Sequence, residues 1–243
     1  MRVVAIIQAR MGSRRLPGKA LILIQGRTVL EHVIERVRRI KRIDAMVIAT
    51  SVKKENDAIE RKAKAIGVPC YRGSEEDVLD RFVRTAQVYN ADHIVRITAD
   101  CVLLDPQVVD EIIELHLREG YDYTSNILKR TYPRGIVAEV FTQETLHKIA
   151  TCAVNTYHRE HVTTYLRDHP EEFRVGNLEA PSGHFNSEWR WVLDTKDDLN
   201  FVKEVYSLLG TKGKIFGCEP IVHLMHTHFT HQKNSQAIAA PKG

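Results

Sequence analysis

Cysteine is scarce in this 243-residue sequence, and its four thiols lie far apart, at Cys70, Cys101, Cys152 and Cys218. They form no C-x-x-C pair, which argues against a zinc ribbon or a thioredoxin-type site. Isolated thiols are typical of the reducing cytoplasm, so we expect a cytoplasmic protein. Long hydrophobic runs are lacking too: no segment approaches the roughly 18 apolar residues of a membrane span. No signal-peptide pattern follows the N-terminus, and we expect no association with a membrane.

A strong excess of charge of one sign is also missing. The chain has 35 Lys and Arg against 31 Asp and Glu, a formal net charge of +4. This mild excess suits an anionic small ligand and is too weak to indicate nucleic acid as a partner. With 43% hydrophobic and 27% charged residues, the composition is that of an ordinary globular protein with a real core.

Hydrophobic patterning alternates between strand and helix over the first 120 residues. We expect strands at 3–7, 45–50, 68–72 and 93–98. Helical stripes cover 28–40, 54–67, 74–89 and 105–120, with Ser74 as the N-cap of the third helix. This alternation predicts βαβ units, and hence an α/β fold with a mainly parallel sheet between two layers of helices.

The rhythm changes after residue 120. We expect strands at 121–126 and 135–141 and helical segments at 142–150 and 159–169. A strand at 188–195 should return to the main sheet before a helix at 196–209. We therefore predict one domain over residues 1–210 and a C-terminal tail over 211–243, with 233–243 as a mobile end.

The tail carries a histidine cluster with two interpretations. Clustered histidines can bind a transition metal, but the spacing here fits no structural zinc pattern. An ordinary polar tail or a subunit contact is therefore the favoured interpretation. The residues concerned are His223, His226, His228 and His231.

A basic, glycine-containing loop follows the first expected strand, in the stretch "IIQARMGSRRLPGKAL". Glycines let backbone N–H groups converge on a phosphate, and Arg and Lys add charge-assisted hydrogen bonds. The loop departs from a P-loop, because five residues separate Gly12 from Gly18 and Ala20 follows Lys19 where that motif has a hydroxyl. We predict a phosphate-binding loop; a plain basic surface loop is the alternative.

Two carboxylates are expected at the same edge of the sheet as this loop. Asp100 follows the strand at 93–98, and Asp194 ends the strand expected at 188–195. Mg²⁺ favours one or two carboxylates together with phosphate oxygens and water. The pair therefore indicates metal-assisted phosphoryl chemistry. For Asp194, a role as a helix N-cap is an equally weighted alternative.

The chain resembles the cytidylyltransferase family that makes CMP-activated sugar acids, including the CMP-KDO and CMP-acylneuraminate synthetases. Within that family it is most similar to the spore coat polysaccharide biosynthesis (SpsF) group. The phrases that carry the resemblance span roughly residues 3 to 209: "IIQARMGSRRLPGKAL", "YRGSEEDVLDR", "VRITADCVLLDP", "TYPRGIVAEVF", "YHREHVTTYL" and "VLDTKDDL".

The resemblance implies a nucleotide-diphospho-sugar transferase fold, which is Rossmann-like. It implies transfer of CMP from CTP to a sugar or sugar acid, with Mg²⁺ as cofactor and pyrophosphate as the leaving group. The product would supply a surface or spore-coat polysaccharide. Two alternatives stay open: an enzyme of the same fold that uses another nucleotide or a sugar-phosphate acceptor, and a non-catalytic nucleotide-binding protein.

The resemblance also implies roles for individual residues. Asp100 and Asp194 match the metal carboxylates, and catalysis would fall to Arg10, Arg15, Lys19 and Asp100. Nucleotide contacts would come from Gln8, Ala9, Arg10, Gly12, Ser13, Arg15 and Lys19. Candidates for contacting the base are Arg72, Gly73, Ser74 and Arg81.

An acceptor pocket and a homodimer contact are expected in the region from about 121 to 175. The candidate acceptor residues are Asn126, Arg134, Glu139, Arg159 and His161. Arg159 could pair with a sugar-acid carboxylate; alternatively, residues 158–169 form only a solvated amphipathic helix. After the strand at 93–98 the sequence departs from the family: it has "ADCVLLDP" where sugar-acid synthetases often carry "GDEP", which leaves the acceptor's identity open.

Overall fold

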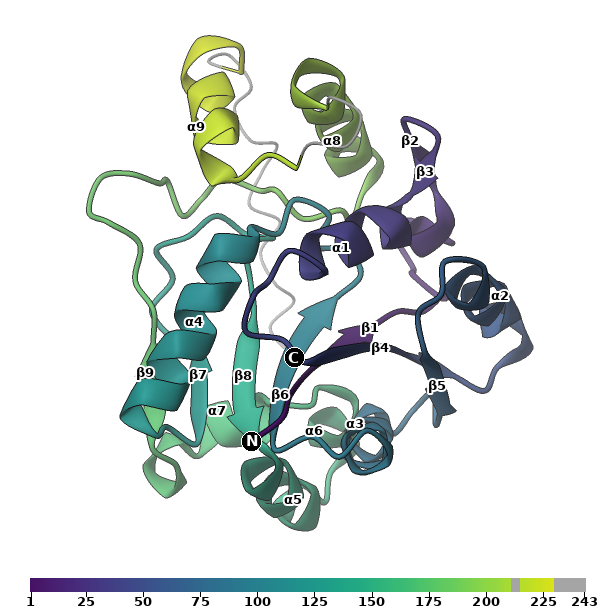
Figure 1. The fold of residues 1–243 in the computed structure, drawn as a ribbon, viewed down its shortest axis with the longest axis vertical. Coiled ribbons are helices and arrows are strands. Elements are labelled where there is room, and N and C mark those ends of the chain that lie inside the picture. Colours follow the sequence, from purple (N-terminus) through teal and green to yellow (C-terminus); the bar gives the residue numbers. More distant parts are fainter. Residues whose placement is uncertain (211–214, 230–243) are drawn as a thin grey trace.

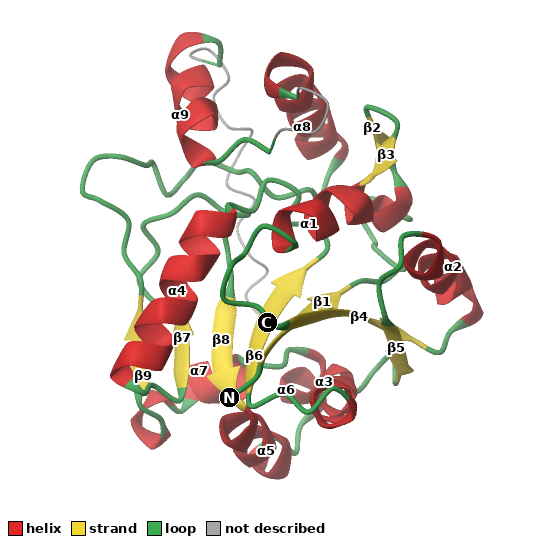
Figure 2. Ribbon diagram, in the orientation of Figure 1, coloured by secondary structure: helices red, strands yellow, loops and turns green. Residues whose placement is uncertain are grey.

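A seven-stranded sheet forms the centre of the computed structural model, which describes residues 1–210 and 215–229 (Figure 1). The strand order is β5-β4-β1-β6-β8-β7-β9. The first four strands in this order run parallel, whereas β8 runs antiparallel to both of its neighbours. Helices cover both faces (Figure 2). The prediction of a three-layer α/β/α fold with a mainly parallel, mixed sheet is confirmed.

The first half of the chain forms the elements that its patterning predicts. The strands are β1 (Val3–Gln8), β4 (Ala45–Ser51), β5 (Cys70–Gly73) and β6 (His93–Thr98). The helices are α1 (Val29–Val37), α2 (Asp57–Ala65), α3 (Val78–Val88) and α4 (Pro106–Glu119). Short elements that we did not predict are η1 (Lys19–Leu21), β2 (Leu23–Ile24), β3 (Arg27–Thr28) and η2 (Lys54–Asn56).

The predicted start of the third helix was wrong. α3 begins at Val78, and the side chain of Asp77 accepts a hydrogen bond from the Asp80 N–H as its N-cap. Ser74 lies one turn earlier, where its Oγ accepts from the Asp77 N–H at 2.9 Å. An Asp caps a helix as well as a Ser does, and here it leaves the preceding turn free to approach the loop after β1.

The middle of the chain completes the sheet with shorter strands. These are β7 (Tyr123–Ser125), β8 (Glu139–Thr142) and β9 (Val175–Asn177). The helices are α5 (Gln143–Cys152), α6 (Thr156–Glu160) and α7 (Thr164–Asp168), followed by η3 (Pro170–Glu172). The single helix expected at 159–169 is thus broken into two pieces, and Thr163 at the break donates a hydrogen bond to a buried carboxylate, that of Glu139.

The strand predicted at 188–195 was also wrong. This segment is extended, but only Arg190 forms a bridge, with Arg134, and the last strand to join the sheet is β9. Its alternating pattern has another cause. Trp189 and Trp191 are buried and stack with ring centroids 5.8 Å apart, whereas Arg190 between them faces Asp198. Burial alternates as in a strand, although the bridge to Arg134 is the only strand-like pairing of this segment among the described residues.

The C-terminal part contains α8 (Lys196–Leu209), as predicted, and α9 (Cys218–Thr227), which we did not predict. The buried side chains of α9 join the same apolar cluster as α1 and α4. Arg36 of α1 anchors the approach to α9, because its Nη1 donates to the carbonyl oxygens of Leu104 and Phe216 at 3.0 and 2.8 Å. The expected mobile end at 233–243 lies outside the described residues.

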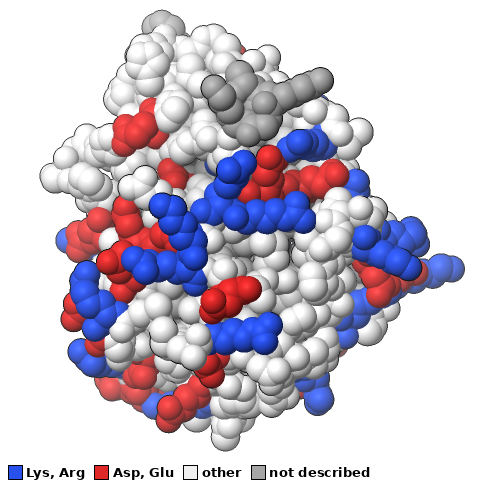
Figure 3. All heavy atoms as spheres, viewed as in Figure 1, with Lys and Arg blue, Asp and Glu red and all other residues white. Residues whose placement is uncertain are grey.

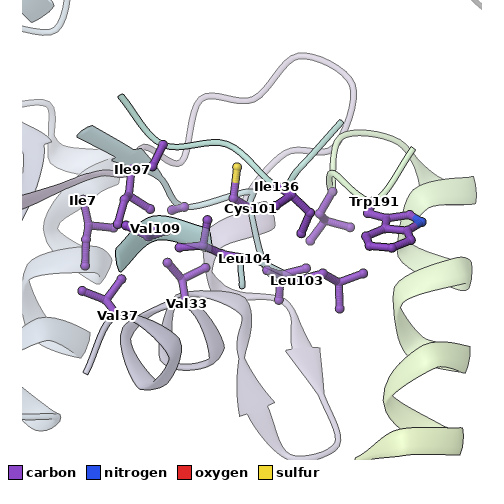
Figure 4. Close-up of a cluster of buried hydrophobic side chains, with 14 of the residues drawn as sticks. Ile7, Val33, Val37, Ile97, Cys101, Leu103, Leu104, Val109, Ile136 and Trp191 are labelled. Carbon is purple, nitrogen blue, oxygen red and sulfur yellow. The ribbon is translucent and has the colours of Figure 1, made fainter. Parts of the chain in front are cut away.

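Alternate residues of the strands point into two separate apolar layers. In β1, Ala5 and Ile7 pack with α1, α2 and α4, while Val4 and Ile6 pack with α3, α5 and α7. Figure 4 shows part of the first layer, with Trp191 beside Leu103 at its end. Burial of one such aliphatic side chain contributes about 1.5–3 kcal/mol, so these layers hold the strand ends in place. None of the described helices is long and apolar enough to cross a membrane.

Candidate active site

The polar residues singled out in the sequence meet at the carboxyl edge of the parallel strands. The loop Ala9–Gly18 leaves β1, and Asp100 lies two residues beyond the end of the adjacent strand β6. The backbone N–H of Leu193 donates to the carbonyl oxygen of Asp100 at 3.0 Å, which brings Asp194 to the same place. In parallel α/β sheets this edge is where ligands bind.

Lys19 is the centre of this cluster. Its Nζ donates to Asp100 Oδ2 at 2.7 Å, to the Leu193 carbonyl oxygen at 3.0 Å and to Asp194 Oδ1 at 3.3 Å. Side-chain exposure is 15% for Lys19, 25% for Asp100 and 16% for Asp194, so water screens these charges only partly. The predicted convergence of loop and carboxylates is therefore present in the structure.

Asp194 does not cap α8, so that alternative was wrong. The N-cap is Thr195, which forms a capping box with Asp198. The Asp194 carboxylate faces cations instead: it pairs with Arg15 and Lys19 and lies 3.6 Å from Arg190. Arg190 in turn forms two hydrogen bonds with Asp198, at 2.7 and 3.0 Å. Asp194 is thus surrounded by cations at the site and is not used as a helix cap.

Asp100 is held as an anion. Burial raises the pKa of its carboxyl group, but the Lys19 charge and hydrogen bonds from Lys19 and Thr98 outweigh this, and the net pKa is lowered. The Thr98 hydroxyl donates to Asp100 Oδ1 at 2.5 Å. Cys101, the next residue, is buried, and burial raises the pKa of its thiol to about 12, so it is not a nucleophile at neutral pH.

The loop after β1 is closed by its own backbone. The Met11 carbonyl oxygen accepts from the N–H groups of Ser13 and Gly18, both at 2.9 Å. Gly18 has φ +70°, a left-handed conformation that favours glycine and allows this closure. The N–H groups of Gly12, Arg14 and Arg15 make no hydrogen bond to any described residue. They are the donors available for an anion, whereas those of Ser13 and Gly18 are occupied.

Several residues that we did not predict contact the loop and hold its backbone and side chains in place. The side chain of Asn56 is fully buried, and its Oδ1 accepts from the Met11 N–H at 2.8 Å while its Nδ2 donates to Ser51 Oγ at 2.6 Å. Arg10 lies 3.7 Å from Glu75 and 3.8 Å from Glu160. A Cβ added at Gly12 would lie 3.0 Å from Glu55 Oε1, so a side chain there would crowd the loop.

The segment 72–81 has mostly structural partners. Arg72 pairs with Asp57 and Glu60 at 2.7 and 2.8 Å and so fastens β5 to α2. Arg81 is buried and donates to the Ser74 carbonyl oxygen, and burial lowers the pKa of its guanidinium to about 10. A Cβ at Gly73 would lie 2.9 Å from Arg81 Cγ. Glu75 links this segment to Arg10, and therefore to the loop.

The candidate acceptor residues do not form one cluster. Asn126 is fully buried, with Nδ2 donating to the Ile136 carbonyl oxygen at 2.7 Å and Oδ1 without a partner among the described residues. The charges of Glu139 and Arg159 are matched within the protein, by Arg96 and by Asp77 at 2.5 Å. His161 is exposed and packs edge-on against Tyr157. Arg134 is exposed and bridges to Arg190 through its backbone.

The histidines of the predicted tail have ordinary contacts where they are described. The ring of His226 packs edge-on against Trp189, and His228 Nε2 lies 2.7 Å from Glu204 Oε1. His223 is exposed. His231 lies outside the described residues. Three of these histidines thus lie on or next to α9, a helix packed on the core and not a polar tail, and these contacts give no support to a metal site.

The oxygen atoms around the Lys19 ammonium group are ligands that would suit a divalent cation. An ammonium group already contacts two carboxylate oxygens and one carbonyl oxygen there. These are the hard oxygen ligands that Mg²⁺ prefers, and two carboxylates can balance its charge. On the face shown in Figure 3, basic and acidic side chains are interspersed.

A basic, glycine-containing loop and two carboxylates thus meet at the ligand-binding edge of this sheet, an arrangement compatible with nucleotide chemistry. The family model described as cytidylyltransferase matches residues 4–216, and the chain belongs to this family. It is thus an enzyme of the nucleotidyltransferase class.

Individual relatives agree with this assignment. The chain is 38% identical over 227 residues to the spore coat polysaccharide biosynthesis protein SpsF of Bacillus subtilis, covering 91% of this chain and 93% of that protein. A cytidylyltransferase structure from Leptospira borgpetersenii superimposes with a TM-score of 0.90 at 32% identity, covering 99% and 100% of the two chains. The structure of CMP:2-keto-3-deoxy-manno-octonic acid synthetase complexed with CTP shares the fold, with a TM-score of 0.64, 18% identity and coverage of 86% and 99%.

Proposed function

We propose that this enzyme transfers CMP from CTP to a hydroxyl group of a sugar or sugar acid and releases pyrophosphate. In this reaction the hydroxyl oxygen forms a bond to the α-phosphorus, and the bond from the α-phosphorus to the bridging oxygen of pyrophosphate breaks. The hydroxyl proton passes to solvent. The observation that carries the proposal is the contact of Lys19 with both Asp100 and Asp194, beside a loop with unused backbone donors.

The loop binds the triphosphate in this proposal. The N–H groups of Gly12, Arg14 and Arg15 are its donors to the phosphate oxygens, because they have no partner among the described residues. Arg15 and Lys19 add positive charge, which stabilises the negative charge that develops on the departing pyrophosphate. Arg10, which is fixed by Glu75 and Glu160, lies at the start of the loop and binds the nucleotide from that side.

Asp100 and Asp194 would hold Mg²⁺. The bound ion supplies positive charge at the α-phosphate and lowers the pKa of an acceptor hydroxyl. The protein's own part is to keep both carboxylates in place. The Thr98 hydroxyl orients Asp100, and the contacts of the Asp194 and Thr195 backbone with the Asp198 carboxylate hold the segment that carries Asp194.

In this proposal the acceptor binds next to β7 and β8, in the region 121–175. Asn126 supports this, because its buried Oδ1 has no partner among the described residues and such an atom is costly to leave unpaired. The name of the Bacillus relative leads us to propose a sugar destined for a surface or spore-coat polysaccharide. Glu139 and Arg159 have partners within the protein, so we assign neither of them a contact with the acceptor.

The test is pyrophosphate release from CTP in the presence of Mg²⁺ and a panel of sugars and sugar acids, including sugar phosphates. Release that depends on CTP and on one acceptor class supports the proposal. Release from UTP, GTP or ATP but not from CTP would mean a different nucleotide. CTP binding without release, with every acceptor, would favour a nucleotide-binding protein that does not catalyse.

We also propose that the enzyme acts as a homodimer through the segment before and within α6. Val154 and Tyr157 there are 89% and 54% exposed, although both are large and apolar. Paired burial of such side chains is typical of subunit contacts. Sedimentation equilibrium should give a dimer for the natural chain and a monomer for Val154→Glu. A natural chain that sediments as a monomer at assay concentrations would contradict this.

A further inference from the structure

A chain of hydrogen bonds crosses three neighbouring strands and ends at Gln8. Arg96 of β6 pairs with Glu139, which is its direct register partner on β8. On its other side, Arg96 Nη2 donates to Gln8 Oε1 at 3.2 Å. Gln8 is the last residue of β1 and directly precedes the loop. The three side chains therefore connect the middle region to the start of the nucleotide site.

Glu139 gives this chain a fixed end. It is 2% exposed, and its Oε1 accepts from Tyr123 Oη at 2.7 Å and from Thr163 Oγ1 at 2.6 Å. Burial raises the pKa of its carboxyl group, but the Arg96 charge and these hydrogen bonds outweigh that, and the net pKa is lowered. Glu139 is thus a buried anion with its partners satisfied, which fixes the guanidinium of Arg96 in one direction.

The guanidinium decides which way the Gln8 carboxamide faces. A guanidinium group has only donors, so the atom of Gln8 that it contacts must be the carbonyl oxygen. The Nε2 amino group is then turned away from Arg96, and it has no partner among the described residues. Gln8 therefore turns a hydrogen-bond donor toward a ligand, while its carbonyl oxygen is directed at Arg96.

Gln8 lies at the carboxyl end of β1, directly before the loop that binds the triphosphate in the proposed function. Its side chain is on the same face as Val4 and Ile6, whose layer includes α3. Arg10, two residues further on, lies 3.7 Å from Glu75 in the turn before α3. A base bound between the start of the loop and this turn would therefore meet Gln8.

We propose that Arg96 and Glu139 are positioning residues that hold Gln8 as a donor, and that this donor selects cytosine over uracil. The inference rests on the proposed use of CTP. Cytosine has a lone pair at N3, which accepts a hydrogen bond, whereas uracil carries an N–H there. A fixed donor is complementary to the first and opposed to the second. A carboxamide free to turn would accept from uracil N3–H.

Titration calorimetry with CTP and UTP tests this on three variants. Gln8→Glu keeps an oxygen toward Arg96 but removes the donor, and should weaken CTP binding about tenfold. Arg96→Met with Glu139→Gln removes both buried charges together and frees the carboxamide to turn. The matched control is Gln87→Glu, which makes the same change at an exposed position of α3. Thermal unfolding of each variant shows that it is folded.

The expected result is a ratio of UTP to CTP dissociation constants that is large in the natural chain and in Gln87→Glu. In the double variant the ratio should fall about tenfold, mainly because UTP binds better. A purely structural role would weaken both nucleotides equally and leave the ratio unchanged. An unchanged ratio in a folded double variant therefore overturns this inference alone. If the natural chain binds no CTP, the proposed function fails as well.

Discussion

Lys19 and Asp100 are 81 positions apart in the chain, yet the Lys19 ammonium donates to the Asp100 carboxylate at 2.7 Å. The pairing of β1 with β6 places the end of one strand beside the end of the other. The cation and the carboxylate lower each other's energy before any substrate arrives. In the proposed function, a triphosphate and a metal ion would give each of these two charges a new partner of opposite sign.

Removal of either loop cation should weaken CTP binding. Lys19→Ala and Arg15→Ala each delete one charge-assisted hydrogen bond to phosphate, worth about 1.5–3 kcal/mol. Calorimetry measures the change in affinity directly. Lys64→Ala, at an exposed position of α2, is the matched control and should bind CTP as the natural chain does. Equal affinities for all three variants would show that the loop does not hold the nucleotide.

Asp100→Asn and Asp194→Asn should each lower the rate of pyrophosphate release by about 100-fold or more, because each removes a charge that acts on the transition state. In the proposed function both carboxylates hold one metal ion, so the double variant should be little worse than either single one. The Mg²⁺ concentration needed for half-maximal rate should rise in both single variants.

The control for these substitutions is Asp197→Asn, at an exposed position in the first turn of α8. It should keep the natural rate and Mg²⁺ dependence. A natural rate in Asp100→Asn would remove the metal-site interpretation. A second result would be just as damaging: if the losses in the two single variants simply added in the double variant, the carboxylates would be acting independently.

The sequence predicts most of the sheet, because its signals there are local. Apolar runs such as that of β1 and the stripe of α1 are visible over a few residues, and so is the basic loop between them. The edge position of Asp100 follows directly, since it comes after a predicted strand. The capping of α3 was misplaced for a local reason: Ser74 and Asp77 are both good N-caps, and patterning alone does not rank them.

The parts that could not be predicted depend on strand order and on packing. Arg96 contacts Gln8 and Glu139 only because β6 lies between β1 and β8. Asn56 lies in the polar first turn of the helix predicted at 54–67, and its burial comes from the loop folding over it. α9 left a weak signal that we missed, since Cys218, Ile221, Val222 and Met225 have helical spacing. Pro and His residues among them concealed it.

Gly135 is a point where the middle region touches the segment that carries Asp194. It has φ +109°, and a Cβ there would lie 2.5 Å from the backbone carbonyl carbon of Trp191. A left-handed backbone conformation alone costs a non-glycine residue about 1–2 kcal/mol. Gly135→Ala should therefore lower the free energy of unfolding by more than this amount. Urea denaturation measures the change. Gly67→Ala is the control, because Gly67 has φ +67° but no atom within 4 Å of an added Cβ. Equal losses would show that the contact with Trp191 adds no energy.

The buried His116 should make the protein less stable in mild acid. Burial lowers the pKa of its imidazole from 6.5 to about 4, with a smaller contribution from the charge of His93. Its ring nitrogens contact His93 Nδ1 at 3.0 Å and Thr124 Oγ1 at 3.1 Å. Between these two pKa values the unfolded chain binds a proton that the folded chain does not, so stability falls as the pH drops through this window.

The stability that His116 contributes should thus be complete above pH 6.5 and lost progressively down to pH 4. The full effect of such a shift is on the order of 3 kcal/mol, at about 1.4 kcal/mol for each pKa unit. Urea denaturation at pH 7 and at pH 5 measures it. His116→Gln is neutral throughout and keeps hydrogen-bonding atoms, so its stability should fall less between the two pH values, even if it is lower at pH 7. An equal fall in both proteins would assign the acid sensitivity to other groups, because only His116 differs between them.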